Sequence, residues 1–371
     1  MENGQTASAP PAKSGRNYGI DLLRILSMFS IVLLHVLGEG GIGQGVAPFS
    51  RNYYGYLTLR FLNEFAVDAF GMVSGYVMCK SRPRISRLIS LWLEVLFYSA
   101  GISMLFILFN RPAVPSVRAE FYSMLLPITG GRYWYMSCYF CLFFFIPVLN
   151  AGLEKLPKRE LLGALAGLFF LICVAGSLNT SRKDPFAMNY GFSAAWLCVL
   201  YLAGGAYRIY GEQLRIRAWQ ALLGIAACVL ATVYFKHWMD ANRWRLSYTL
   251  DWMMMSNVSI TYTLTAFFML TLFARMKPGA AAQKVIRLLS PAALGVYLIH
   301  VHPMVWSRFI TGRFAGLAGL HWLAMLAAAV AAAMGIFAAC MAIELGRIHL
   351  FRLIRIEKLC EGAEKLLQRL G

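Results

Sequence analysis

Charged residues are scarce in this chain of 371 residues, and acidic residues are the scarcest of them. Only 14% of the residues are charged, with 17 Asp and Glu against 35 Lys and Arg, whereas 59% are hydrophobic. A typical soluble domain has roughly 25% charged and about 45–50% apolar residues. The composition therefore argues against a water-soluble globular protein.

The hydrophobic residues come in blocks of about twenty, the length of helix that crosses the ~30 Å hydrocarbon core of a bilayer. We expect an all-α fold, a polytopic integral membrane bundle of about ten transmembrane helices embedded in the lipid bilayer of a bacterial-type cytoplasmic membrane. The ten candidate spans lie at about residues 18–37, 61–79, 87–109, 133–151, 160–177, 193–210, 216–235, 254–274, 290–311 and 317–345.

The formal net charge of +18 comes mostly from Lys and Arg in the short loops between these blocks. More of them lie on the side of the N-terminus, and the positive-inside bias then places both termini in the cytoplasm. Because the basic residues form no face of a soluble domain, we expect no nucleic-acid partner. We expect a disordered cytoplasmic tail over 1–17, a transmembrane domain over 18–346 and a cytoplasmic amphipathic tail over 347–371.

The eight cysteines indicate neither a disulfide framework nor a metal site. Nearly all of them lie inside apolar blocks, which does not match a framework of exposed, disulfide-bonded loops. Cys138 and Cys141 form a Cys-x-x-Cys, but no second pair of ligands accompanies it. We interpret both as packing residues and expect no bound metal.

The first candidate span contains two ionisable side chains, which are costly inside a bilayer and are often functional there. Arg24 lies near its start and His35 near its end. Their separation is about three helical turns plus roughly 20°, so both share one helix face, ~16 Å apart along the axis. Asp21, three residues before Arg24, can orient the guanidinium. Either residue alone could serve the helix ends, but the shared face favours a functional pair.

Four cations lie close together in the loop after the second span: Lys80, Arg82, Arg84 and Arg87. The positive-inside bias explains part of this cluster. Arg84 and Arg87, however, open the third span at i,i+3 spacing and so project from one side of the helix. Guanidinium groups placed in this way suit bidentate contacts with phosphate. A phosphate-bearing ligand from the cytoplasm would meet Arg24, Arg84 and Arg87 together.

Two carboxylates begin the second span at a depth comparable to that of His35. Glu64 and Asp68 are one helical turn apart, and either could orient the imidazole. We prefer Asp68 for this role. A carboxylate at a helix start, or a partner for Arg60, explains these residues equally well.

Other candidates are less distinctive. His300 lies at mid-span beside Tyr297, where it could line a cavity or simply be buried with a satisfied hydrogen bond. Ser74 and Gly75 are interpreted as small residues that allow close helix contact rather than as a nucleophile.

Arg24 and His35 reproduce the Arg-x10-His motif of the membrane-bound acyltransferase family 3 proteins, which acylate cell-surface glycans and other exported molecules. The sequence resembles that family over about residues 18–356, and five motifs in the right order make the resemblance specific. The four further segments are Val67 to Tyr76, similar to Phe-Phe-x-x-Ser-Gly-Tyr with Gly71 in place of the second aromatic residue; Arg84-Ile85-Ser86-Arg87, similar to Arg-x-x-Arg; 130–150, similar to a Trp-Tyr-rich span ending in Ile-Pro; and 295–306, similar to Gly-x-Tyr-Leu-Ile-His.

The resemblance implies that the co-substrate is an acyl-CoA, with acetyl-CoA preferred, and that it enters from the cytoplasm. Its phosphates would bind the three arginines, Arg24, Arg84 and Arg87, and its pantetheine arm would reach the imidazole. His35 would act as general base or as acyl acceptor, two routes that the sequence leaves open, with Asp68 beside it. The candidates for binding the acceptor are Glu64, Tyr297 and His300.

We therefore expect an O-acyltransferase that moves an acyl group to a hydroxyl of an exported or lipid-linked saccharide. The alternative is a permease for a small polar molecule such as an amino acid, because a serine-permease-like module of similar sequence occurs in some bacterial membrane racemases. No racemase-like domain follows in this sequence. A discontinuous pair of helices and internal symmetry would favour transport, and the sequence indicates neither.

Overall fold

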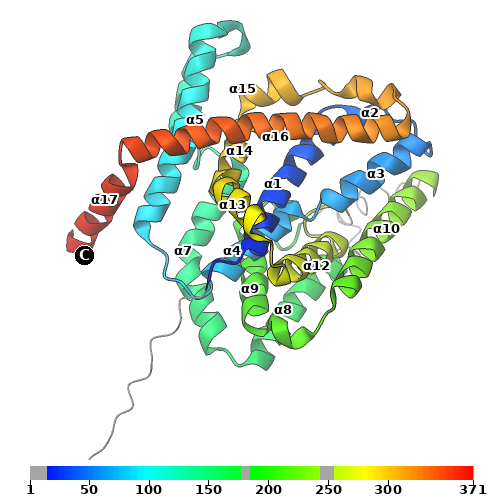
Figure 1. The fold of residues 1–371 in the computed structure, drawn as a ribbon, viewed down its shortest axis with the longest axis horizontal. Helices are drawn as coiled ribbons and strands as arrows, with labels where there is room; N and C mark the ends of the chain where they lie inside the picture. The colour runs from blue at the N-terminus through cyan, green and yellow to red at the C-terminus, as the bar shows by residue number, and fades with distance from the viewer. Residues whose placement is uncertain (1–14, 177–183, 243–254, 371) are drawn as a thin grey trace, which may run out of the picture.

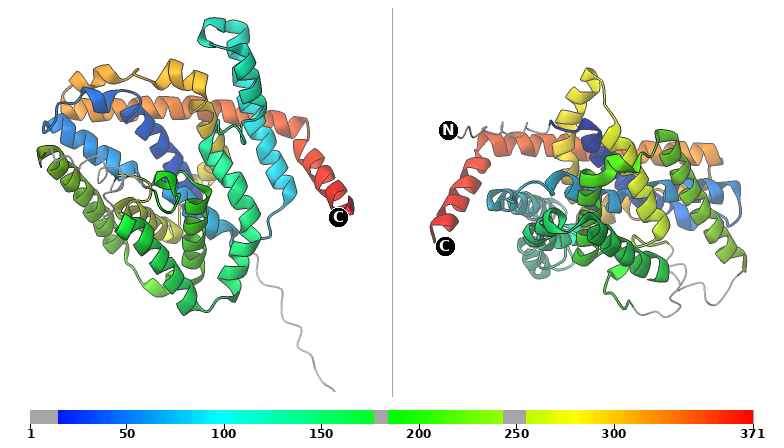
Figure 2. Two further views of the ribbon diagram at one scale, coloured as in Figure 1. Left: turned by 180° about the vertical axis from the view of Figure 1, so that it is seen from behind. Right: turned by 90° about the horizontal axis from the view of Figure 1, so that it is seen from below.

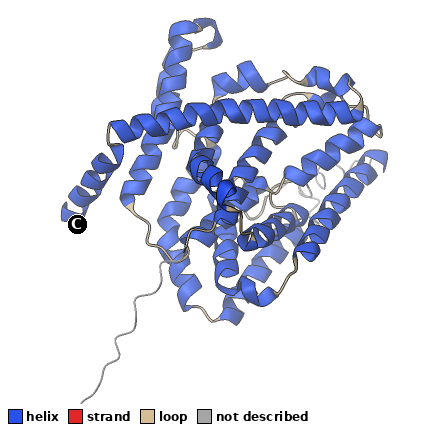
Figure 3. Cartoon of the chain, viewed as in Figure 1, coloured by secondary structure: helices blue, strands red, loops and turns tan. Residues whose placement is uncertain are grey.

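The computed structural model describes residues 15–176, 184–242 and 255–370. These residues are almost wholly helical, and no strand occurs among them (Figure 3). The expectation of an all-α fold is therefore confirmed. Most of the tail expected over 1–17 lies outside the described residues.

Within the described part of the chain, six helical stretches are long and apolar enough to cross a membrane. The chain is thus a multi-pass membrane protein, whereas the number of about ten spans and the cytoplasmic placement of both termini stay predictions. The six stretches are Tyr18–Gly45, Ile85–Phe109, Trp134–Lys155, Ala218–Asn242, Ala280–His300 and Trp322–Leu353.

The other expected spans correspond to shorter helices. The span expected at 61–79 is divided between the end of α3 (Arg51–Asn63) and α4 (Ala66–Met78). The spans expected at 160–177, 193–210 and 254–274 correspond to α8 (Lys158–Phe169) with the π-helical η2 (Phe170–Ala175), to α9 (Ala194–Tyr210) and to α12 (Ile260–Arg275).

The span expected at 290–311 is interrupted near its middle. The α14 helix (Ala293–His300) ends there, and the short α15 (Pro303–Val305) follows. The residue before a proline avoids the helical region, and His302 accordingly has extended backbone angles, φ −57° and ψ 129°. This break places His300 at a helix end inside the bundle rather than in the middle of a span.

The first helix, α1 (Tyr18–Leu37), lies at the centre of the bundle. It begins at Asn17, whose side chain accepts a hydrogen bond from the backbone N–H of Ile20, as a residue that caps a helix start commonly does. It packs against α3, α4, α12, α14 and the long α16 (Trp322–Leu353), which crosses it in Figure 1. One face of α1 is therefore enclosed by several other helices.

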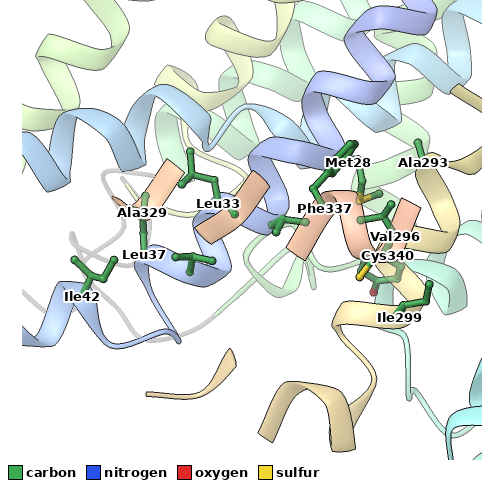
Figure 4. Close-up of a cluster of buried hydrophobic side chains, with 14 of the residues drawn as sticks. Met28, Leu33, Leu37, Ile42, Ala293, Val296, Ile299, Ala329, Phe337 and Cys340 are labelled. Atoms are coloured by element: carbon green, nitrogen blue, oxygen red, sulfur yellow. The ribbon is translucent and has the colours of Figure 1, made fainter. Parts of the chain in front are cut away.

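A hydrophobic core joins α1 to α14 and α16. Figure 4 shows Met28 of α1 beside Val296 of α14 and Phe337 of α16. Lipid tails are as apolar as these side chains, so close van der Waals packing rather than transfer from water holds the membrane helices together. This core fixes how α14 is placed against α1, and therefore where His300 lies.

Glycine determines how closely α4 and α9 approach. A Cβ added to Gly75 would lie 1.9 Å from the backbone oxygen of Tyr201, and one added to Gly204 would lie 1.8 Å from that of Met72. Both distances are far below a van der Waals contact, so neither position can hold a larger residue at this separation. The interpretation of Gly75 as a small residue at a helix contact is confirmed.

Three helices extend beyond the bundle. The α5 helix (Ile85–Phe109) and α6 (Val117–Leu125) form a projecting hairpin, and α17 (Ile356–Leu370) bends away from the end of α16 (Figures 1 and 2). The boundary expected between 346 and 347 falls inside α16, and the amphipathic tail helix begins only at Ile356. The remaining helices are α2 (Ile42–Gly45), α7 (Trp134–Lys155), α10 (Ala218–Asn242) and α13 (Ala280–Leu289).

Candidate active site

A cavity of about 530 Å³ runs along one face of α1. Both Arg24 and His35 line it, as their shared helix face predicts. Its size is within the usual range for small-molecule sites, about 300–1,000 Å³. Its other polar lining residues are Glu39, Arg60, Glu64, Ser74, Tyr135, Tyr139, Asn257, Ser290 and Tyr297.

At one end of the cavity, two imidazole rings form a hydrogen-bonded pair. His35 Nδ1 lies 3.0 Å from His300 Nε2, and His300 Nδ1 lies 2.6 Å from the backbone oxygen of Val296. A carbonyl oxygen only accepts, so His300 carries its proton on Nδ1. With both rings neutral, His300 Nε2 then accepts from the Nδ1–H of His35. The lone pair of His35 is therefore on Nε2, the nitrogen that can act as a base.

The environment of the two rings differs. His300 is fully buried, whereas His35 is half-buried and lines the cavity. The ring of Trp306 lies edge-on to that of His35, with 4.7 Å between ring centroids. His300 thus serves as a fixed hydrogen-bond acceptor behind a more accessible His35.

A glycine places the helix that carries His300. A Cβ on Gly295 would lie 2.3 Å from Oε2 of Glu344 on α16, so a larger residue there would displace this side chain or move α14 away from α16. Glu344 is itself bound by Arg347, with 2.9 Å from Nε to Oε2, and it accepts a hydrogen bond of 2.6 Å from Tyr98 Oη. The Gly-x-Tyr-Leu-Ile-His segment therefore combines a packing residue with the histidine that contacts His35.

At the other end of the cavity, Arg24 is held by hydrogen bonds. Its Nη1 lies 3.4 Å from both Asp21 Oδ1 and Ser290 Oγ. Ser290 Oγ in turn donates to Asp21 at 3.1 Å, and Arg16 Nε lies 2.5 Å from the same carboxylate. Asp21 thus contacts Arg24, as the spacing of three residues predicts. The Arg24 side chain remains 30% exposed, so it is accessible to an anion.

The two candidate carboxylates have different positions. Glu64 lines the cavity and accepts a hydrogen bond of 2.9 Å from Arg60. Asp68 is fully buried and accepts hydrogen bonds of 3.0 Å from Trp196 Nε1 and from Thr263 Oγ1.

This placement corrects the role preferred for Asp68. Its contacts join α4 to α9 and α12, and the hydrogen bond that orients His35 is made by His300 instead. Glu64 caps the end of α3 and Asp68 lies in the first turn of α4, so the break between the two helices separates the carboxylates. The packing of α4 on α9 then directs Asp68 toward Trp196. Sequence spacing alone could not decide this direction.

Arg84 and Arg87 line a separate, smaller cavity of about 60 Å³. Leu91 and Tyr139 line both this cavity and the larger one. Arg84 is paired with two glutamates of α17, at 3.4 Å from Glu361 and 3.8 Å from Glu364. Arg24 therefore does not share a cavity with Arg84 and Arg87, although the two cavities have lining residues in common.

Several residues that line the cavity or contact His35 were not predicted. Glu39 lies four residues after His35 but beyond the end of α1 at Leu37, so helical spacing does not place it. Trp306 falls inside a segment that resembles the acyltransferases, yet nothing in its spacing indicates a contact with His35. Asn257 carries no sequence signal, because it reaches the cavity from a loop.

A family model described as an acyltransferase domain matches residues 17–344. The chain belongs to acyltransferase family 3. Comparison with curated proteins and with solved structures found no match. Membership supports a membrane acyltransferase and does not support the permease alternative.

Proposed function

We propose that this acyltransferase moves an acyl group, with acetyl as the preferred group, from cytoplasmic acyl-CoA to a hydroxyl of an exported or lipid-linked saccharide. One observation carries the proposal: a single cavity has a guanidinium at one end, that of Arg24, and a hydrogen-bonded imidazole at the other, that of His35. An anionic carrier with a long arm and a reactive end needs such an arrangement.

The dimensions support acyl-CoA as the donor. Arg24 and His35 are separated by ~16 Å along α1, a length that a pantetheine arm can span. The phosphates would bind near Arg24, and the thioester would lie beside His35. Apolar side chains of α1 between these ends, including Met28, Ile31 and Leu34, would contact the arm.

The tautomer derived for His35 supports a role in proton transfer. In the direct route, Nε2 takes the proton of the acceptor hydroxyl while its oxygen attacks the thioester carbon. The new C–O bond forms, the C–S bond breaks, and the departing thiolate receives the proton from His35. In the second route, Nε2 itself attacks the thioester carbon, the C–S bond breaks and CoA leaves as its thiolate. The acceptor oxygen then attacks the acyl carbon, the C–N bond to the imidazole breaks, and the hydroxyl proton passes through solvent to the thiolate.

The acceptor would bind at the histidine end. Glu64 and Tyr297 line the cavity and offer an acceptor and a hydroxyl for the hydrogen bonds that a saccharide needs. Trp134 and Tyr135 line the same cavity, and aromatic faces suit the apolar side of a sugar ring. His300 contacts His35 and would act as a positioning residue.

The test is mass spectrometry of surface glycans from cells with and without this protein. We expect acetyl groups to disappear from one glycan when the gene is deleted, and to return with the wild-type gene or with His349→Ala, which alters an exposed histidine of α16. Unchanged glycans, and no transfer by the purified protein to any saccharide, would refute the proposal. Incubation with acetyl-CoA in the absence of acceptor separates the two routes, because only the second leaves an acetyl group on His35.

Sidedness is a separate prediction. With the arginine end in the cytoplasm and His35 toward the outer half, cysteines introduced at Arg82 and at Ser50 should react with an impermeant thiol reagent from opposite sides. The background variant lacks the native cysteines. Labelling of both positions from outside would overturn this topology and the cytoplasmic donor with it.

A further inference from the structure

A second cavity, of about 240 Å³, shares Arg24 with the active-site cavity. It lies among the segment before α1, the start of α1, the end of α4 and the end of α9. Its lining residues are Gly15, Arg16, Asn17, Ile20, Asp21, Arg24, Tyr76, Val77, Lys80 and Arg208. Arg24 therefore stands between two cavities.

The lining of the second cavity is strongly cationic. It includes four basic residues, two of which are Lys80 and Arg208, and one acidic residue, Asp21. Asp21 already contacts Arg16, Arg24 and Ser290. The excess of positive charge is therefore not balanced by the cavity's own side chains.

Arg208 is held in place by an aromatic ring. Its Nη1 donates to Tyr76 Oη at 2.7 Å, and its guanidinium lies 4.8 Å from the centroid of the same ring. Asn17 Nδ2 also reaches Tyr76 Oη, at 3.4 Å. A guanidinium has five N–H donors, so these contacts orient Arg208 and leave donors for an anion. Lys80, at the end of α4, is exposed and adds a second, movable cation.

The neighbouring basic residue Arg84, in contrast, is paired with two carboxylates. Glu361 and Glu364 of α17 occupy its guanidinium, and Glu364 also accepts a hydrogen bond from the backbone N–H of Ile85 at 2.9 Å. An anion that binds Arg84 would lie beside these two carboxylates, whose negative charge opposes its binding. Among the described residues, no carboxylate is paired with Arg208 or Lys80 in the second cavity.

We propose that this second cavity binds the phosphate groups of the acyl donor's nucleotide, with Arg208 and Lys80 as phosphate-binding residues. This inference rests on the proposed function, because it assigns one part of the same donor. Arg24 would then contact the phosphates from one side while the arm enters the active-site cavity on the other. The shared chemistry, a phosphate group, also occurs in anionic lipids, and the test separates the two sources.

The experiment measures binding of CoA to the full-length protein in nanodiscs of phosphatidylcholine, by calorimetric titration. Arg208→Gln and Lys80→Ala should each raise the Kd for CoA about 10- to 100-fold, because each removes a hydrogen bond to a charged group. Arg159→Gln, at an exposed cation of α8, is the matched control and should leave the Kd unchanged. Because Arg208 also contacts Tyr76, the exposed Lys80 keeps the test valid if Arg208→Gln fails to fold.

Three other outcomes would contradict the inference. If CoA binds both variants as it binds the wild type and only Arg84→Ala weakens it, the phosphate site lies at α5 and the proposed function survives. If the wild type binds no CoA, the donor itself is wrong. If nanodiscs with phosphatidylglycerol abolish CoA binding to the wild type but not to Arg208→Gln, the cavity is a site for lipid phosphate.

Discussion

The two ends of the active-site cavity are built in different ways. At the arginine end, Arg24 contacts Asp21, three residues away in the same helix, as well as the distant Ser290, and keeps 30% of its side chain exposed. At the histidine end, His35 contacts His300, 265 positions away in the sequence, and that partner is fully buried. An anion site needs accessible charge, whereas a base needs one nitrogen held without its proton. The first can be built locally, but the second depends on packing.

The largest expected effect is at the histidine end. His35→Ala should lower kcat/KM for acyl transfer by about 10²- to 10⁴-fold, the usual contribution of a general acid or base. His349→Ala is the control and should retain wild-type activity. If His35→Ala retained more than about a tenth of the activity while folding normally, the two ends would no longer differ in chemical role.

A smaller loss of activity is expected from a change at His300, which contacts His35. His300→Ala should lower kcat about 10- to 100-fold, because the ring of His35 loses the contact that fixes its tautomer and position. His300→Gln, whose amide oxygen can still accept from His35 Nδ1–H, should recover part of that loss. The pH profile of kcat/KM should shift in His300→Ala. An unchanged profile, or equal activity of the two variants, would give His300 a merely structural role.

A change at the arginine end should affect KM rather than kcat. Arg24→Ala should raise KM for acyl-CoA about tenfold or more with a small change in kcat, since a charge-assisted contact with phosphate binds the donor before and during the reaction alike. Arg24→Lys should not restore the affinity, because an ammonium cannot reproduce a bidentate contact. A fall in kcat at constant KM would place Arg24 in the chemical step and remove the contrast between the two ends.

The smallest effect on chemistry is expected at Asp68. Asp68→Ala should destabilise the protein by about 1–3 kcal/mol, because Trp196 Nε1 loses its buried acceptor. Activity per folded molecule should stay close to that of the wild type. Thermal unfolding in detergent, followed with activity on the same sample, measures both quantities. A loss of activity in fully folded protein comparable to that of His35→Ala would return Asp68 to the catalytic site.

Much of the fold could be predicted from the sequence. Blocks of about twenty apolar residues predicted helices, because only a helix satisfies its own backbone hydrogen bonds in hydrocarbon. The break near Pro303 and the division between α3 and α4 were not predicted, since a mean over about twenty residues is insensitive to one interrupted turn. The count of spans therefore stays open where short helices replace long ones.

The sequence by itself determined what lies on one helix and what its spacing implies. Arg24, His35 and Asp21 belong to α1, and helical geometry alone places the first two on one face and the third beside Arg24. Tertiary structure alone decided which distant residues meet that face. His300 reaches His35 because Gly295 lets α14 approach α16, and Asp68 turns toward Trp196 because α4 packs closely on α9. Contacts within a helix depend on its period, whereas contacts between helices depend on packing that no local pattern records.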